Sequence, residues 1–175
     1  MDTDQRLLSA IRTVPDYPKP GIQFKDITPL LADATLLGLA VDALVAPFRH
    51  DTVTKVVGIE SRGFILGSLL AERLGAGFVP VRKKDKLPYH IRAVEYSLEY
   101  GTDTIEIHTD AVTRDDYVLV HDDVIATGGT AAACHALVSQ AGANFIGYSF
   151  LLELAALGGR ARLPSATRIH SVLVI

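Results

Sequence analysis

Blocks of apolar residues recur along the chain in two alternating forms. Short, nearly continuous apolar runs bounded by turn residues are typical of buried strands. They predict strands at 55–60, 77–83, 104–109, 117–122, 144–154 and 171–175. Longer segments whose apolar residues lie three or four positions apart predict helices at 4–12, 34–50, 62–75 and 129–142. Strands that alternate with helices indicate an α/β protein with a mainly parallel sheet flanked by helices.

Two segments lack such a period. Residues 15–33 contain four prolines and a glycine, so we expect an irregular and largely extended segment. Residues 84–100 are polar and follow neither a helical nor a strand period, so we expect a flexible loop. Asp33 is placed to cap the helix that starts at 34, and Gly75 is placed to end the helix at 62–75.

The composition fits one soluble domain. The chain has 175 residues, of which 49% are hydrophobic and 21% charged, which is enough for one sizeable core. Its net charge of -3 gives no general attraction to nucleic acid. Cys134 is the single cysteine, so no internal disulfide forms and a reducing compartment is favoured. Without a long apolar run or a signal-peptide pattern, we expect a cytoplasmic protein that binds neither nucleic acid nor membrane.

The most informative stretch is VHDDVIATGGTAAA, residues 120–133, where Asp122 and Asp123 precede a Thr-Gly-Gly-Thr turn at 127–130. Backbone N–H groups of a tight turn and a helix N-terminus form an anion site. The turn is neither a Walker loop, since it has no Lys, nor a G-x-G-x-x-G loop. Two carboxylates would repel a polyphosphate, so they need vicinal hydroxyls or a metal ion as partner. A ligand with a ribose and a 5′-phosphate satisfies both halves.

Residues 118–130, VLVHDDVIATGGT, resemble the signature with which type I phosphoribosyltransferases bind phosphoribosyl pyrophosphate (PRPP). Three further stretches resemble the adenine-specific branch of that family, so the resemblance spans most of the chain. They are PKPGIQFKDITPLLAD at 18–33, GIESRGFILG at 58–67 and YSLEYG at 96–101. The resemblance implies a Rossmann-like type I phosphoribosyltransferase fold with a small N-terminal hood.

The same resemblance implies how the chain is organised and what it does. One phosphoribosyltransferase domain would span 1–175, with 1–33 forming the base-binding hood and 84–100 a flexible catalytic loop. The implied reaction is purine salvage, in which adenine and PRPP give AMP and pyrophosphate. It depends on Mg²⁺, which is bound through PRPP and water near Asp122 and Asp123 rather than directly by the protein. The implied assembly is a homodimer, in which basic residues partly serve the neighbouring subunit.

Each part of the site is implied by residues at matching positions of the family motifs. The residues implied to bind the ribose and 5′-phosphate are Asp122, Asp123, Ala126, Thr127, Gly128, Gly129 and Thr130. Those implied to bind pyrophosphate are Ser61, Arg62, Arg82, Lys83 and Lys86. Those implied to bind adenine are Gln23, Phe24, Lys25 and Leu154. The catalytic residues implied are Glu99 and Arg62, and Glu99 would accept a proton from the base or fix its tautomer.

Two other functions remain open. PRPP-binding transcription regulators share this fold, but they usually carry an added DNA-binding segment, and here about 15 residues precede the first family motif. A transferase for hypoxanthine, guanine or xanthine is the second alternative, against which the stretches FKDITPLL and ESRGF favour adenine. Two reactive residue types are expected only to pack. Cys134 lies inside a helix, and His121 alternates away from Asp122 toward the other side of the sheet.

Overall fold

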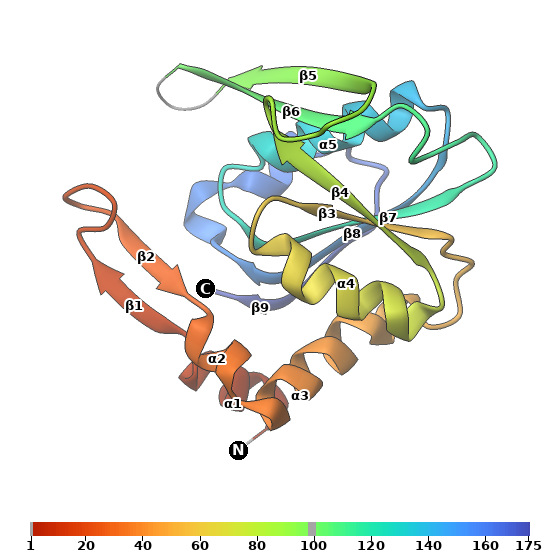
Figure 1. Cartoon of the computed structure of the whole chain (residues 1–175). Helices are drawn as coiled ribbons and strands as arrows, with labels where there is room; N and C mark the ends of the chain where they lie inside the picture. The colour runs from red at the N-terminus through yellow and green to blue at the C-terminus, as the bar shows by residue number, and fades with distance from the viewer. Residues whose placement is uncertain (1, 98–100) are drawn as a thin grey trace. The chain divides into compact units, whose positions relative to one another are not determined.

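Residues 2–97 and 101–175 are described by the computed structural model of the chain (Figure 1), which divides into two units, Met1–Ala43 and Leu44–Ile175. The first unit contains an antiparallel hairpin and short helices. Its elements are α1 (Thr3–Ser9), β1 (Arg12–Pro15), β2 (Gln23–Asp26), α2 (Thr28–Ala32) and most of α3 (Ala34–Val45). As predicted, Asp33 caps α3, because its Oδ1 accepts the N–H groups of Thr35 and Leu36 at 2.8 and 3.0 Å.

The prediction that 15–33 is irregular is wrong for β2 and α2. The prolines lie at the edges of elements rather than inside them. Pro15 is the last residue of β1, and Pro29 lies in the first turn of α2, where a missing N–H breaks no helical hydrogen bond. The segment that joins β1 to β2 includes a cis Tyr17–Pro18 peptide. Prolines therefore mark the turns of this hairpin without preventing its strands.

The second unit is built on a seven-stranded sheet with the order β5-β6-β4-β3-β7-β8-β9. Its strands are β3 (Lys55–Ile59), β4 (Gly77–Lys83), β5 (Ile91–Ser97), β6 (Thr102–His108), β7 (Tyr117–Ile125), β8 (Asn144–Glu153) and β9 (Ile169–Val174). Its helices are α4 (Gly63–Leu74), α5 (Gly129–Gln140) and the short 3-10 turns η1 (Ala46–Phe48), η2 (Ala155–Leu157) and η3 (Gly159–Arg162). The five strands from β4 to β9 in this order are parallel, and β6 runs antiparallel to β4 and β5. The predicted α/β fold with a mainly parallel sheet is confirmed.

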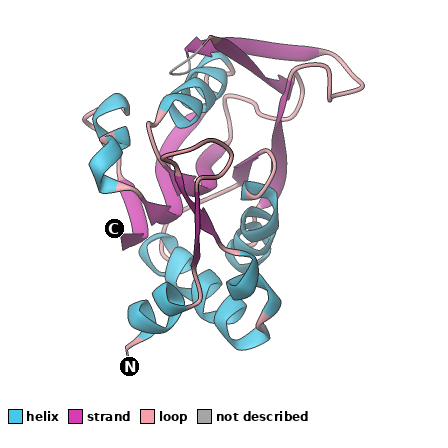
Figure 2. Ribbon diagram, turned by 90° about the vertical axis from the view of Figure 1, so that its left-hand side faces the viewer, coloured by secondary structure: helices cyan, strands magenta, loops and turns pink. Residues whose placement is uncertain are grey.

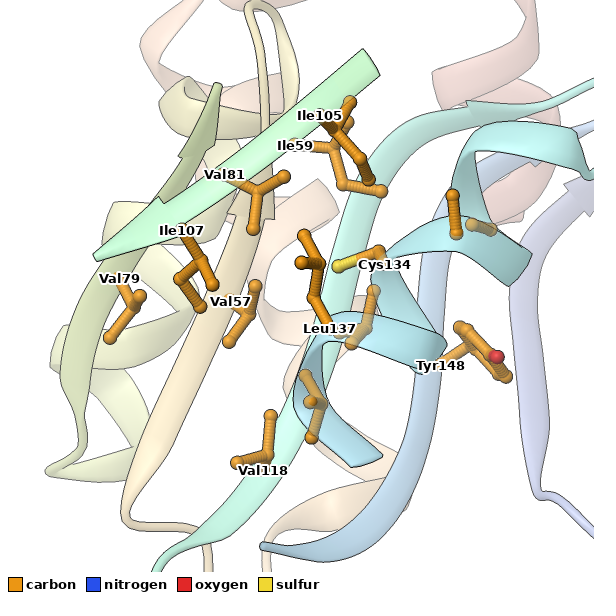
Figure 3. Close-up of a cluster of buried hydrophobic side chains, with 14 of the residues drawn as sticks. Val57, Ile59, Val79, Val81, Ile105, Ile107, Val118, Cys134, Leu137 and Tyr148 are labelled. Carbon is orange, nitrogen blue, oxygen red and sulfur yellow. The ribbon is translucent and has the colours of Figure 1, made fainter. Parts of the chain in front are cut away.

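Helices α4 and α5 lie on opposite sides of this sheet (Figures 1 and 2). On the α5 side, side chains from β3, β4, β6 and β8 meet Cys134 and Leu137 of the helix (Figure 3). Burying one such Val or Leu side chain contributes about 1.5–3 kcal/mol, so this cluster fixes α5 on the sheet. On the α4 side, Leu66 and Leu70 are fully buried. Helix α4 ends as predicted at Gly75, whose φ of 66° is left-handed.

The prediction of a flexible loop over 84–100 is wrong in that Ile91–Ser97 form a strand, β5. Among the described residues, this strand pairs only with β6, from Ile91 opposite His108 to Ser97 opposite Thr102. Its side chains alternate between exposed and half-buried, because it is an edge strand. Because the side chains of β5 differ little in burial, its sequence lacks the clear apolar and polar alternation that predicts a strand. Residues 98–100 lie outside the described part.

The topology brings three loops to one edge of the sheet. Strands β4, β3 and β7 are parallel neighbours, so the segments that follow them, 84–86, 60–62 and 126–128, start from the same side. Ligands of open α/β sheets bind at this carboxyl edge. Within the described residues, no helix is long and apolar enough to cross a membrane.

Candidate active site

The loop after β7 forms a small pocket at the start of α5. Gly128 adopts a φ of 78°, a left-handed conformation that favours glycine, and α5 begins at the next residue. The pocket measures about 90 Å³ and is lined by Asp122, Val124, Ile125, Ala126, Thr127, Gly128, Gly129, Thr130 and Ala131. Pockets for drug-sized ligands are several times larger, at about 300–1,000 Å³, so this one fits a single anionic group of a larger ligand.

A second segment supports this loop from outside. A Cβ on Gly128 would overlap the carbonyl oxygen of Gly159, and a Cβ on Gly159 would overlap that of Ala126. The two backbones therefore pack directly on each other. The supporting segment is held by Arg160, whose Nη2 and Nε bind the Glu153 carboxylate at 2.6 and 3.0 Å. Sequence patterns did not identify this support, and its one signal was the Gly158–Gly159 pair.

The structure separates the two neighbouring aspartates. Asp122 lines the pocket, and its Oδ1 accepts the N–H of Asp123 at 2.9 Å. Asp123 is only 4% exposed, and its Oδ2 lies 2.9 Å from Nε of Arg62. Burial and the negative charge of Asp123 raise the pKa of Asp122 well above its usual value. Burial also raises the pKa of Asp123, and Arg62 opposes that shift. A ligand that donates hydrogen bonds would stabilise the ionised Asp122.

The loop after β3 brings Arg62 to this position. The Glu60–Ser61 peptide is cis, Ser61 is exposed, and Arg62 immediately precedes α4. A Cβ on Gly63 would lie 2.8 Å from Oδ1 of Asp122. The first residue of α4 therefore sits directly against the aspartate, and only glycine allows this approach.

The basic residues at the end of β4 pair with acidic side chains. Arg82 binds Glu60 through Nε at 3.1 Å, and the backbone N–H of Lys83 donates to the same carboxylate at 3.0 Å. Burial opposes ionisation of Glu60, but these hydrogen bonds prevail and lower its pKa. The ammonium group of Lys83 lies 3.3 Å from Asp103, while the side chain of Lys86 is exposed. Arg82 and Lys83 are therefore already oriented by carboxylates.

The residues implied for the base occur in both units. Gln23, Phe24 and Lys25 form most of β2, and Phe24 packs edge to face on Tyr17, with ring centroids 5.2 Å apart. Both rings line a pocket of about 270 Å³ within the first unit, together with Val14 and Asp26. Leu154 follows β8 in the second unit and is half-buried. The hairpin thus offers an aromatic wall, and a shared role of Phe24 and Leu154 remains a prediction.

Glu99 lies outside the described residues, but the strand that precedes it reaches the loop. A Cβ on Gly129 would lie 3.4 Å from the carbonyl oxygen of Ser97 and 3.6 Å from the Tyr96 ring. The hydroxyl of Thr130 donates to that of Tyr96 at 3.3 Å. Sequence patterns did not identify Tyr96, because its role depends on a tertiary contact.

The two residues expected only to pack are fully buried, which confirms that prediction. Burial raises the pKa of the Cys134 thiol, so it is not an activated nucleophile. Burial lowers the pKa of His121 to about 4, so this side chain is neutral at pH 7. It lies against α4, where a Cβ on Gly67 would be 3.3 Å from its ring.

Comparison with known proteins gives a consistent result. No protein-family model matches the chain. Adenine phosphoribosyltransferase of Acidothermus cellulolyticus is 58% identical over 172 residues, which cover 98% of this chain and 97% of that protein. The crystal structure of adenine phosphoribosyltransferase from Rhodothermus marinus matches with a TM-score of 0.96 and 61% identity, over 99% of this chain and 98% of that one.

A more distant solved structure agrees. Adenine phosphoribosyltransferase from Saccharomyces cerevisiae, crystallised with an imino-altritol bisphosphate and adenine, matches with a TM-score of 0.92 and 40% identity, over 98% of both chains. These similarities extend over nearly the whole length of each protein, and they confirm the resemblance of the four sequence stretches. The chain belongs to the adenine phosphoribosyltransferase family.

Proposed function

We propose that the chain transfers the 5-phosphoribosyl group of PRPP to adenine, giving AMP and pyrophosphate. The observation that carries this proposal is the pocket after β7, where a turn and a helix start lie beside the carboxylate of Asp122. An anion site next to a hydrogen-bond acceptor fits a 5′-phosphate joined to a ribose. Family membership supports adenine as the base, since the yeast relative was crystallised with adenine.

In this proposal the loop 126–130 binds the 5′-phosphate through its backbone N–H groups and the hydroxyls of Thr127 and Thr130. Asp122 and Asp123 bind the 2′- and 3′-hydroxyls of the ribose. The place of Asp122 in the pocket lining supports its role. The ion pair with Arg62 at 2.9 Å fixes the carboxylate of Asp123 beside it. Charge-assisted hydrogen bonds of this kind are stronger than neutral ones.

The leaving pyrophosphate would be bound by Ser61, Arg62, Arg82, Lys83 and Lys86. Arg62 follows β3, and Arg82 and Lys83 are the last residues of β4, so all three lie at the carboxyl edge of these strands. Arg82 and Lys83 lie beside Glu60 and Asp103, and the larger negative charge of pyrophosphate would compete for them. Cations aimed at the leaving group stabilise the charge that develops on it in the transition state.

Mg²⁺ fits this site as a partner of the substrate. Among the described residues, no group of three or more His, Cys, Asp or Glu is placed to hold a metal ion. Asp122 and Asp123 supply two carboxylates, which suits a cation that keeps several waters and takes its other ligands from substrate oxygens. When bound, Mg²⁺ would neutralise charge on pyrophosphate. The two aspartates would orient it through the ribose hydroxyls and water.

The base would stack on Phe24 and Leu154, and backbone groups of Gln23 and Lys25 would read its edge. The aromatic wall formed by Phe24 and Tyr17 supports this assignment. In the transfer, a bond forms between adenine N9 and ribose C1′ while the bond from C1′ to pyrophosphate breaks. Pyrophosphate leaves with the electron pair, and Glu99 takes the proton from the base.

We further propose that segment 1–33 serves as the base-binding hood of one phosphoribosyltransferase domain, and that 84–100 is its catalytic loop. The aromatic pocket on the hairpin supports the first assignment, and the closeness of Ser97 to Gly129 supports the second. The single, buried cysteine suits a reducing compartment, so we place the reaction in the cytoplasm.

The protein is expected to be a homodimer, because the basic segment Arg82–Lys86 would complete the neighbouring pyrophosphate site. Light scattering at several concentrations should give twice the mass of the chain. Lys86→Ala, which removes an exposed cation, should raise the KM for PRPP without changing this mass, and Lys55→Ala serves as a control away from the carboxyl edge. A fully active monomer would reject the shared site.

Replacing either aspartate should weaken the use of PRPP. Asp122→Asn and Asp123→Asn each remove a charge-assisted hydrogen bond of roughly 1.5–3 kcal/mol, which raises the KM for PRPP by roughly 10- to 150-fold. Asp123→Asn should also lower the melting temperature, since it removes the buried ion pair of Asp123 with Arg62. Asp122→Asn should not, because removal of its charge relieves repulsion by Asp123.

Steady-state kinetics with PRPP varied, together with thermal unfolding, check both expectations. Asp115→Asn is the matched control, because Asp115 is exposed and lies in the turn before β7, at the opposite end of the strand. Wild-type KM values in both Asp122→Asn and Asp123→Asn would show that these aspartates do not bind the ribose.

Base specificity tests the choice of adenine. Initial rates with PRPP, Mg²⁺ and each purine base in turn should be far higher for adenine than for guanine or hypoxanthine. A faster reaction with guanine would exclude adenine as the preferred base and leave the phosphoribosyl site unaffected.

A further inference from the structure

Tyr96 faces the proposed phosphate loop from a different part of the sheet. It lies on β5, directly opposite Asp103 of β6, and its half-buried ring packs against the core cluster. One edge of the ring is 3.6 Å from the position that a Cβ on Gly129 would occupy. The ring therefore covers the first turn of α5.

The Tyr96 hydroxyl connects two sets of functional residues. Thr130 Oγ1 donates to Tyr96 Oη at 3.3 Å, and Tyr96 Oη donates to Asp103 Oδ2 at 3.3 Å. The same carboxylate oxygen lies 3.3 Å from Nζ of Lys83, and Thr104 N–H donates to the other oxygen at 2.8 Å. A continuous chain of contacts thus runs from Thr130 to Lys83.

The protonation states of this chain are consistent with the hydrogen bonds. Burial raises the pKa of Tyr96, so its hydroxyl keeps its proton at neutral pH. Burial opposes ionisation of Asp103, but hydrogen bonds from Thr104 and Lys83 prevail and lower its pKa. Asp103 is therefore a carboxylate that accepts from both Tyr96 and Lys83.

We propose that Tyr96 is a positioning residue for PRPP, which orients the hydroxyl of Thr130 toward the 5′-phosphate. This inference rests on the proposed function, which gives Thr130 to the 5′-phosphate and Lys83 to the pyrophosphate. Before PRPP binds, the hydrogen-bonded chain from Lys83 of β4 through Asp103 of β6 holds the Tyr96 hydroxyl beside Thr130 of α5.

The chemistry of the hydroxyl explains why tyrosine is suited to this position. A threonine hydroxyl has one proton, so Thr130 donates either to Tyr96 or to a phosphate. When a phosphate takes that proton, the Thr130 oxygen becomes an acceptor, and Tyr96 turns its single proton from Asp103 toward it, while Asp103 keeps its ion pair with Lys83. Tyr96 thus holds Thr130 in both states, since its hydroxyl donates and accepts. Phenylalanine keeps the ring packing and loses this function.

Binding of ribose 5-phosphate, measured by calorimetry, tests the proposal with a probe that occupies the 5′-phosphate loop alone. Tyr96→Phe should weaken this binding by about 3- to 10-fold, the effect of one neutral hydrogen bond. It should raise the KM for PRPP by a similar factor and leave the KM for adenine unchanged. In a Thr130→Val background, Tyr96→Phe should have no further effect, because Tyr96 acts through the Thr130 hydroxyl.

Tyr148→Phe is the matched control. Tyr148 belongs to the same core cluster, and its buried hydroxyl has no hydrogen-bond partner among the described residues, so binding should not change. Wild-type affinity in Tyr96→Phe, or effects of Tyr96→Phe and Thr130→Val that simply add, would overturn the proposal and leave the proposed function standing. Failure of the wild-type protein to bind ribose 5-phosphate would remove the 5′-phosphate site and this proposal together.

Discussion

Glu99→Gln should lower kcat by about 10²–10⁴-fold, the usual contribution of a general acid–base residue. The substitution keeps the size and polarity of the side chain and removes the proton acceptor. The KM for PRPP should change much less, because in the proposed function its phosphates would be bound by the loop after β7 and by the basic residues at the ends of β3 and β4. Ser97, two residues earlier in the chain, lies close to Gly129 of the loop after β7, where an added Cβ would be 3.4 Å from the Ser97 carbonyl oxygen.

Steady-state kinetics with both substrates varied measure this effect. Glu95→Gln is the matched control, because Glu95 is an exposed residue of β5 four positions earlier, and the same change there should leave kcat unaltered. A kcat for Glu99→Gln equal to that of Glu95→Gln would show that Glu99 takes no part in the chemistry.

Gly128→Ala should raise the KM for PRPP by about 100-fold or more, the scale expected when a binding loop is displaced by about 1 Å. Alanine at a φ of 78° costs about 1–2 kcal/mol. Its Cβ would also overlap the Gly159 carbonyl oxygen, and backbone cannot move aside as a flexible side chain can. With overpacking of about 1–3 kcal/mol added, the free energy of unfolding should fall by about 2–5 kcal/mol.

Gly158→Ala separates the two causes. Gly158 has a similar φ of 63°, and a Cβ there meets nothing within 4 Å. The free energy of unfolding of Gly158→Ala should fall only by the cost of the left-handed conformation, about 1–2 kcal/mol. Its KM for PRPP should stay near that of the wild type. Urea unfolding and PRPP kinetics of both variants decide between them. Equal losses of PRPP affinity would contradict direct packing of the two backbones as the cause.

Sequence patterns located the most deeply buried elements. Strands β3, β4, β7 and β8 and helices α4 and α5 carry dense apolar runs, because they form the centre of the sheet and its two covering layers. The loop 126–130 was equally clear, because it needs glycine at a left-handed position and hydroxyls beside it. A backbone conformation that favours glycine can be predicted from the sequence, because it restricts which residue types occur at that position.

The elements that were missed have weaker traces. The hairpin of β1 and β2 was hidden by prolines at its edges, and β5 by the small contrast between its exposed and half-buried positions. Tyr96 and Gly159 support the loop through contacts between segments far apart in the chain. Such contacts depend on the complete fold, so no local pattern reports them. The separate surroundings of Asp122 and Asp123 depend in the same way on where α4 begins.

The most direct test of the central claim is a product assay with the wild-type protein, adenine, PRPP and Mg²⁺. Chromatography of the nucleotide and an assay for inorganic pyrophosphate should show AMP and pyrophosphate forming in equal amounts, with no AMP when PRPP is omitted. PRPP that binds without being consumed would indicate a regulator of the same fold. Pyrophosphate released without AMP would contradict transfer to adenine.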